Sequence, residues 1–215
     1  CPRIEAVLAP ARCPPAIALT IGGSDSGGGA GIQADLKTFL ALQVHGCSAI
    51  SCVPAQNTCG VSRVDALPPE ALSAQIEAVL SDLPVAALKT GMLLNAGLIA
   101  ATARALEPLA IPRLIDPVMV SRAGSVLLEP EAIAAYSTLL LPLADLITPN
   151  LHEARLLSSC SIDGPEAVEA AAAQLLALGP AAVLIKGGGL AALRGRDYLL
   201  SRDGEGRWLE HAPVD

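Results

Sequence analysis

The stretch that decides the fold is Gly22–Gly31, which reads GGSDSGGGAG and follows the apolar run Ala16–Ile21. An Ala/Leu-rich stretch with helical period, Ala30–Leu42, continues from it. A strand, a glycine-rich turn and a helix in this order are typical of an α/β protein with a ligand site at the ends of parallel strands. One turn needs fewer glycines than this segment holds. We therefore expect its backbone to approach a ligand closely.

The same alternation continues along the chain and predicts a doubly wound, mostly parallel sheet with helices on both faces. The further predicted strands are Ala49–Val53, Ala87–Lys89, Arg113–Ile115, Leu146–Thr148 and Ala182–Lys186. The further predicted helices are Pro68–Ser81, Ala96–Leu106, Glu129–Leu140 and Pro165–Leu178. Near the end of the chain, Tyr198–Ser201 and Arg207–His211 flank a DGEG turn and predict a C-terminal β-hairpin. We expect one domain over residues 16–215 and an N-terminal extension over residues 1–15.

The composition excludes several classes of protein. Hydrophobic residues make up 52% of the 215 residues and charged residues only 16%, which excludes intrinsic disorder. No apolar run reaches the roughly 18 residues that a membrane span requires. The net charge of −7 and the aromatic content of 2% argue against a nucleic-acid partner.

The six cysteines have irregular spacing and form no C-x-x-C pair, which argues against a zinc site. Most lie in apolar segments, so we interpret them as reduced, buried thiols of a cytoplasmic protein. The chain begins at Cys1, and a trimmed N-terminus explains this better than a lipoprotein anchor, because Pro2–Pro15 contains no flexible polar tether. His45 and His152 are interpreted as surface or packing residues. Without a nucleophile elbow, hydrolase chemistry has no support.

Polar side chains recur where the predicted strands end. Asp25 gives the glycine loop its own carboxylate, which suits a neutral polar ligand better than a pyrophosphate. Gln56, in the segment Pro54–Thr58, can donate and accept at the edge of a heteroaromatic ring, or it simply caps a loop. Met92 either packs on a flat ligand or belongs to the core. Lys89 is one of three lysines, against eleven arginines, so a specific need for an ammonium group is possible there.

Three further positions point to phosphate and Mg²⁺. Asp116 either holds a water of hydrated Mg²⁺ or begins an Asp-Pro turn. Asn150 and Glu153 have the spacing of a helix capping box, and both could also face a Mg²⁺–phosphate site. Lys186 precedes three glycines and could contact a phosphate as a mobile charge.

The order of these motifs strongly resembles the hydroxymethylpyrimidine/phosphomethylpyrimidine kinases of thiamine biosynthesis, in the ribokinase-like superfamily. The resemblance covers residues 16–215 and is carried by GGSD (22–25), AGIQADLKT (30–38), AQNT (55–58), KTGML (89–93), DPVM (116–119), TPNLHE (148–153) and KGG (186–188). The second of these is the most specific. DPVM and TPN-x-x-E are shared with pyridoxal kinases.

The resemblance implies ATP-dependent phosphorylation of 4-amino-5-hydroxymethyl-2-methylpyrimidine and of its monophosphate, with Mg²⁺. It places the pyrimidine, the small-molecule substrate, at Gly23, Asp35, Pro54, Gln56 and Met92. On the nucleotide side it implies catalytic roles for Lys186 and Asp116, ATP contacts from Asn150 and Lys186, and Mg²⁺ held through water by Glu153 and Asp116. Family members are commonly dimers, so a homodimer is possible.

The resemblance also implies one departure. The family continues into a T-x-N-T-H-G-T-G-C segment that forms an anion hole, whereas this sequence ends at Asp215. We therefore expect the 215-residue chain alone to be impaired, by on the order of 10²–10³-fold or more, because donors to the developing charge are lost. Two alternatives stay open: a pyridoxal-type kinase and a non-catalytic pyrimidine-binding paralogue.

Overall fold

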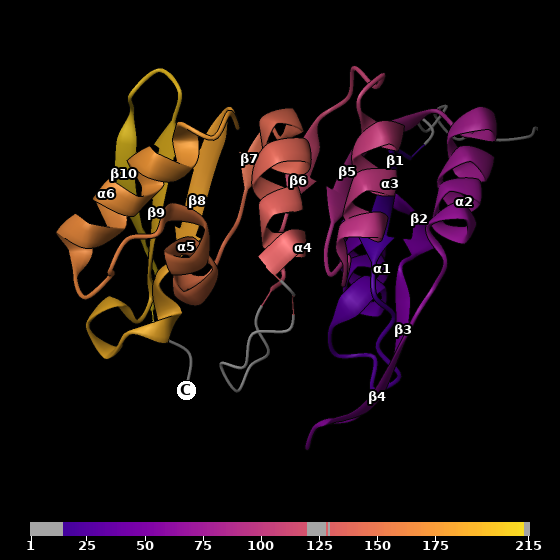
Figure 1. Cartoon of the computed structure of the whole chain (residues 1–215), viewed down its shortest axis with the longest axis horizontal. Helices are drawn as coiled ribbons and strands as arrows, with labels where there is room; N and C mark the ends of the chain where they lie inside the picture. The colour runs from indigo at the N-terminus through magenta and orange to yellow at the C-terminus, as the bar shows by residue number, and fades with distance from the viewer. Residues whose placement is uncertain (1–14, 120–127, 129, 213–215) are drawn as a thin grey trace, which may run out of the picture.

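The computed structural model describes residues 15–119, 128 and 130–212 (Figure 1). Its main sheet has eight strands in the order β10-β9-β8-β7-β6-β5-β1-β2, and β3 and β4 form a separate ribbon. The strands are β1 (Ile17–Gly22), β2 (His45–Ile50), β3 (Cys52–Gln56), β4 (Val61–Ala66), β5 (Val85–Thr90), β6 (Arg113–Ile115), β7 (Leu146–Ile147), β8 (Ala182–Lys186), β9 (Arg196–Ser201) and β10 (Gly206–Glu210). The α-helices are α1 (Gly31–Ala41), α2 (Pro69–Asp82), α3 (Ala96–Leu106), α4 (Pro130–Ala135), α5 (Leu151–Ser158) and α6 (Pro165–Leu176).

The sheet confirms the predicted α/β class. Strands β2, β1, β5, β6, β7 and β8 pair in parallel, as buried apolar runs between helices predict. The C-terminal hairpin is also confirmed, because β9 pairs antiparallel with both β8 and β10. All the carboxyl ends of the parallel strands therefore lie at one edge of the sheet.

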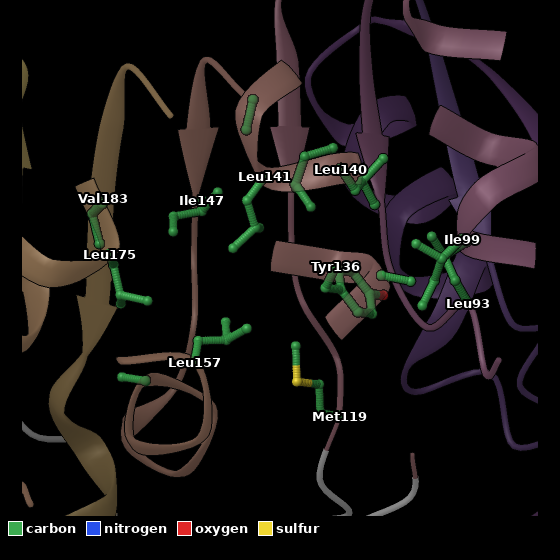
Figure 2. Packing of buried hydrophobic residues seen from close by; sticks show 14 of the residues in the cluster. Leu93, Ile99, Met119, Tyr136, Leu140, Leu141, Ile147, Leu157, Leu175 and Val183 are labelled. Atoms are coloured by element: carbon green, nitrogen blue, oxygen red, sulfur yellow. The ribbon is translucent and has the colours of Figure 1, made fainter. Parts of the chain in front are cut away.

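The two faces of the sheet are covered differently. Helices α2 to α6 lie over one face in Figure 1, and α1 lies behind the sheet at β1 and β2. On the first face the side chains of Leu19, Ile21 and Ile115 are fully buried. Figure 2 shows how this core continues through Tyr136 and Leu140 to side chains under α5 and α6. The core is almost entirely aliphatic, as the scarcity of aromatic residues requires.

The second predicted strand, Ala49–Val53, is wrong as one continuous element. Strand β2 ends at Ile50, and the Gln75 side chain both donates to the Ile50 carbonyl and accepts from the Ile50 amide, so that residue is already paired. After Ser51 the chain leaves the sheet and forms the β3–β4 ribbon. Gln56 therefore lies in a strand and not in a loop, and β4 was not predicted at all.

The predicted helix Glu129–Leu140 is also only partly correct. Glu129 lies outside the described residues, and α4 ends at Ala135. A π-helical turn at Tyr136–Leu140 and a 3₁₀ turn at Leu141–Leu143 follow. Pro142 explains the change, because it has no amide hydrogen with which to continue an α-helical ladder.

Two simpler expectations concern membranes and cysteines. No helix in the described part of the chain is long and apolar enough to cross a membrane. The four cysteines in that part are free thiols, as predicted, but only Cys52 is buried: Cys47 and Cys160 are partly buried, and Cys59 is exposed. His45 and His152 are exposed, which confirms their interpretation as surface residues.

Candidate active site

The glycine loop is organised around a buried carboxylate. Asp25 is 5% exposed and accepts hydrogen bonds from the backbone N–H groups of Gly27, Gly29 and Ala30, at 2.7 to 2.9 Å. Burial raises the pKa of Asp25, but these backbone hydrogen bonds outweigh it, so the pKa lies below its ordinary value. The carboxylate therefore holds the loop together, and a neutral polar ligand at this loop stays a prediction.

Two glycines are required by close packing at the start of α1. Gly31 has φ of +56°, and a Cβ there would lie 2.5 Å from the Gly23 carbonyl oxygen. A Cβ at Gly23 would lie 2.9 Å from Met92 Cε and 3.0 Å from Cys52 Sγ. The end of β1, the segment after β5 and the start of β3 therefore meet closely. This contact brings together the predicted site residues Gly23 and Met92.

Gln56 reaches the same loop through its backbone. The Ser26 hydroxyl donates to the Gln56 carbonyl at 2.5 Å and accepts from the Gln56 amide at 2.8 Å. An open pocket of about 480 Å³ lies here, between the loop and the ribbon. It is lined by Ser26, Ala55, Gln56, Asn57, Cys59, Gly60, Val61 and Ser62. Pro54 is buried two residues before Gln56, so it supports the ribbon and does not line this pocket.

Asp35 lies on α1 and faces the sheet, where it is ion-paired. Its Oδ2 accepts from the Thr20 hydroxyl at 2.6 Å and from Lys89 Nζ at 3.0 Å. Thr20 and Lys89 are direct neighbours in the β1–β5 register. Sequence reasoning named Asp35 but missed Thr20, since a threonine inside a strand carries no distinctive signal.

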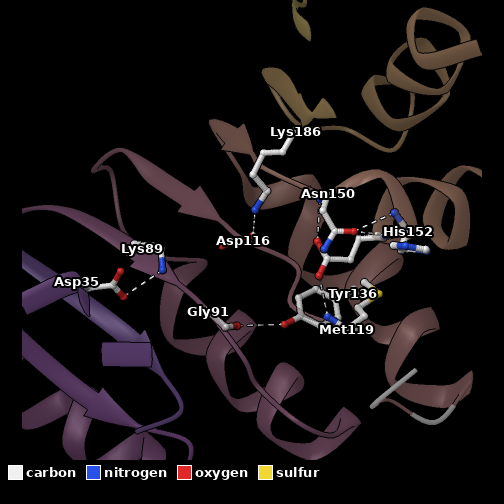
Figure 3. Close-up of polar contacts among 10 residues, drawn as sticks. Asp35, Lys89, Gly91, Asp116, Met119, Tyr136, Asn150, His152 and Lys186 are labelled. Carbon is white, nitrogen blue, oxygen red and sulfur yellow. Dashed lines mark hydrogen bonds and ion pairs between the residues drawn. The ribbon is translucent and has the colours of Figure 1, made fainter. Parts of the chain in front are cut away.

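A second cluster begins at the N-terminus of α5. The Asn150 side chain accepts from the backbone N–H groups of His152 and Glu153, at 2.9 and 3.0 Å. The Glu153 carboxylate accepts hydrogen bonds from the backbone N–H of Asn150 at 2.9 Å and from the backbone N–H of Met119 at 3.2 Å. The predicted capping box is therefore confirmed, and it also ties α5 to the segment that follows β6 (Figure 3).

Lys186 and Asp116 complete this cluster. Lys186 Nζ lies 3.2 Å from Asp116 Oδ1, with the two side chains 41% and 19% exposed. The Lys186 amide donates to the Pro149 carbonyl, which fixes the end of β8 beside Asn150. The structure therefore brings Asp116, Asn150, Glu153 and Lys186 together at the carboxyl edge, as the sequence predicted.

Burial dominates the electrostatics of this cluster. Glu153 is 2% exposed, and burial raises its pKa more than the hydrogen bonds from Asn150 and Met119 lower it. The negative charge of Asp116 raises the pKa of Glu153 further, while Lys186 lowers it.

Tyr136 lies near Asp116 and Glu153, and it was not predicted from the sequence. It is fully buried, and its hydroxyl donates to the Gly91 carbonyl at 3.3 Å (Figure 3). Burial, together with the charges of Asp116 and Glu153, raises the pKa of the Tyr136 phenol. Through this hydrogen bond, the neutral hydroxyl connects Gly91, just after β5, to the helical turn Tyr136–Leu140.

The donors fit a hydrated Mg²⁺ better than a protein-caged ion. The described residues contain no group of three acidic, histidine or cysteine side chains that could hold a metal. Both oxygens of Glu153 already accept backbone hydrogen bonds, so Asp116 has the more available carboxylate. Mg²⁺ is commonly bound by one or two carboxylates, substrate phosphates and several waters, and this arrangement is compatible with that pattern.

The site therefore has a glycine loop with an ion pair at one end of the sheet edge and an acid–lysine cluster at the other. Solved structures that resemble this fold include small-molecule kinases. A phosphomethylpyrimidine kinase from Clostridium difficile has a TM-score of 0.85 at 39% identity, covering 92% of this chain and 85% of that one. An ADP complex of Bacillus subtilis pyridoxal kinase has a TM-score of 0.84 at 35% identity, covering 94% and 76%.

Residues 25–215 match the family model described as phosphomethylpyrimidine kinase. The hydroxymethylpyrimidine/phosphomethylpyrimidine kinase of Synechococcus elongatus is 60% identical over 172 residues, which are 80% of this chain and 65% of that protein. The chain belongs to the phosphomethylpyrimidine kinase family. It spans about two thirds of the length of that relative.

Proposed function

We propose that the chain binds 4-amino-5-hydroxymethyl-2-methylpyrimidine and its monophosphate, together with Mg–ATP, for transfer of the γ-phosphoryl group of ATP to the acceptor. The observation that carries the proposal is the acid–lysine cluster of Asp116, Asn150, Glu153 and Lys186 at the carboxyl edge, in a chain of this family. The acceptor's place is at the glycine loop, where Gly23 packs on Met92, the Gln56 backbone bonds to Ser26, and Asp35 is held by Thr20 of β1.

Each residue of the nucleotide side has a proposed role. Lys186 leaves Asp116 to contact the transferring phosphoryl group, since its side chain is 41% exposed and glycines follow it. Asn150 orients ATP from the N-cap position of α5. Asp116 and, through a water, Glu153 would hold Mg²⁺, which offsets negative charge on the phosphates when bound. Such transfer depends on positioning and on charge neutralisation more than on covalent chemistry.

Calorimetric titration of Mg–ATP tests the proposal directly. We expect Lys186→Gln to raise the Kd for Mg–ATP by about 10-fold or more, because a charge-assisted contact of about 1.5–3 kcal/mol is lost. The pyrimidine alcohol should bind this variant as it binds the native chain. Arg207→Gln is the matched control, because it removes one positive charge at an exposed position of β10. Unchanged affinity of the Lys186 variant for Mg–ATP would contradict the proposal.

A second candidate is a pyridoxal-type kinase, favoured by the resemblance to pyridoxal kinases of Bacillus subtilis and Staphylococcus aureus, the latter solved with pyridoxal. The two acceptors compete for the same site, so relative affinity separates them. We place the aminopyrimidine first, with Gln56 at its ring edge. Gln56→Ala should then weaken the aminopyrimidine more than pyridoxal, and the reverse order would favour the second candidate.

We also propose that the protein acts in the cytoplasm and associates as a homodimer. Support for association comes from the ribbon, where Val53, Val61 and Val64 are 40–53% exposed and where, among the described residues, β4 pairs only with β3. Light scattering of the native chain beside a Val61→Ser/Val64→Ser variant tests this. A smaller mass for the variant would support the dimer, and a monomeric native chain would refute it.

A further inference from the structure

Lys89 is an unusual residue for its position. It lies in β5, one of the central strands of the sheet, between Thr20 of β1 and Leu114 of β6. Its side chain is only 27% exposed. A charged side chain in such a place is costly unless it is paired, so its partner explains its presence.

The partner is Asp35, and the contact is asymmetric. Lys89 donates to Oδ2 of Asp35 (Figure 3), and the Thr20 hydroxyl donates to the same oxygen. No hydrogen bond joins the other oxygen, Oδ1, to the part of the chain that the structure describes. Asp35 is 17% exposed, so the carboxylate is held on one side and available on the other.

The surroundings show where a ligand would meet this carboxylate. A Cβ built on Gly91 would have one neighbour within 4 Å, the Lys89 ammonium at 3.7 Å. The three nearest neighbours of a Cβ on Gly22 would be backbone atoms of Gly91 and Met92, at 3.4–3.6 Å. Open space therefore lies at Gly91, directly after β5 and beside the Lys89 ammonium of the ion pair.

We propose that Lys89 is a positioning residue for acceptor binding: with Thr20, it fixes Asp35 so that Oδ1 accepts a hydrogen bond from the 4-amino group of the pyrimidine. This inference rests on the proposed function. A carboxylate oxygen can only accept, and a pyrimidine alcohol has two kinds of donor, its amino group and its hydroxyl. The hydroxyl is the reacting group and must face the cluster of Lys186 and Asp116. The amino group is therefore the partner of Asp35.

Lys89 and Lys186 have different roles in the proposed site. Lys186 is at the end of β8 and is 41% exposed, so it can leave its carboxylate for a phosphate. Lys89 is within β5 and less exposed, and its carboxylate has a second anchor in Thr20. Two acid–lysine pairs at one sheet edge thus take different roles: a fixed acceptor site and a mobile charge.

The test compares two ligands, the aminopyrimidine alcohol and its analogue with hydrogen in place of the 4-amino group. By calorimetry, Lys89→Met should raise the Kd of the amino compound about 10-fold or more and that of the analogue less than about 3-fold. Lys89→Arg keeps the charge and should remain within about 3-fold for both. Thr20→Val removes the neutral hydrogen-bond donor to Asp35 and leaves no charge unpaired. It should also raise the Kd of the amino compound more than that of the analogue, but by a smaller factor than Lys89→Met. It also carries the test if Lys89→Met does not fold.

Equal weakening of both ligands by Thr20→Val and Lys89→Met would overturn the inference, because a purely structural role does not distinguish the amino group. Unchanged affinity of both ligands would overturn it as well. These outcomes differ from a failure of the proposed function, in which the native chain itself does not bind the pyrimidine alcohol. Arg207→Gln again controls for the loss of one charge.

Discussion

At the scale of single residues, one carboxylate organises the glycine loop from within. Asp25, which is 5% exposed, accepts hydrogen bonds from three backbone N–H groups of the loop. Without this carboxylate, these N–H groups would lose their acceptor. The sequence showed that the loop carries an acid, but not in which direction the acid points. That direction depends on φ values of the following glycines, such as the positive φ of Gly28, which residue types alone do not specify.

Asp25→Ala should therefore destabilise the fold without removing any hydrophobic contact. We expect a loss of about 1–3 kcal/mol in the free energy of unfolding, measured by urea denaturation at pH 7, because the loop amides lose their acceptor. Asp163→Ala, an exposed acid outside the loop, should change stability by less than about 0.5 kcal/mol. Because the folded pKa of Asp25 is lowered, its contribution is complete above the unfolded pKa and is lost in acid. Equal stability of the two variants at pH 7 would contradict this assignment.

Glu153 has the opposite pH dependence. Its folded pKa is raised, chiefly by burial, so the folded state binds more protons than the unfolded state above about pH 4.5. Its contribution to stability is therefore greatest in acid and declines as the pH rises from the unfolded pKa through the folded one. In Glu153→Gln this decline should disappear, although the variant loses one backbone contact. Urea midpoints measured from pH 4 to pH 8 test this, and an unchanged slope would speak against it.

At the scale of elements, the apolar runs predicted the parallel strands well, because each is buried on at least one face and bounded by turn residues. The ribbon was missed for the converse reason. Every residue of β4 is exposed, so Val61–Ala66 shows no buried face and no apolar run. The π turn at Tyr136 was missed because helical period continues through it, and only the backbone bond from Leu141 to Tyr136 reveals the change.

The start of α1 gives a matched test of glycine packing. Gly31→Ala should cost about 1–3 kcal/mol, because the residue has a positive φ and its Cβ would meet the Gly23 carbonyl at 2.5 Å. Gly29→Ala is the control, since a Cβ there would have no neighbour within 4 Å. Thermal unfolding of both variants measures the difference. Similar midpoints would show that the loop is not held as described.

At the scale of the whole molecule, the order of the strands explains why residues far apart in sequence form one site. Parallel strands place their carboxyl ends together, so Asp116, Asn150 and Lys186 could be predicted to meet. Their pairings could not be predicted. Which lysine bonds to which acid depends on strand register, and the neighbours Thr20 and Lys89 become visible only when β1 and β5 are aligned.

Amide hydrogen exchange should divide the molecule along the same lines. Strand β1 is paired on both sides and its apolar side chains are buried, whereas β4 pairs with one strand and is exposed throughout. We expect the amides of β4 to exchange about 100-fold faster than those of β1, as shallow openings do relative to the core. Mass spectrometry of peptic fragments measures this. Equal protection would show that the ribbon is covered in solution.

The contact between Gln75 and Ile50 has a consequence for the behaviour of the protein in concentrated solution. Strand β2 forms one edge of the sheet, and an edge offers free amides and carbonyls to any extended chain. At Ile50 the Gln75 side chain occupies both groups, so an incoming strand finds no partner at the point where the edge approaches the ligand site. A single amide side chain thus blocks strand addition at this end of β2.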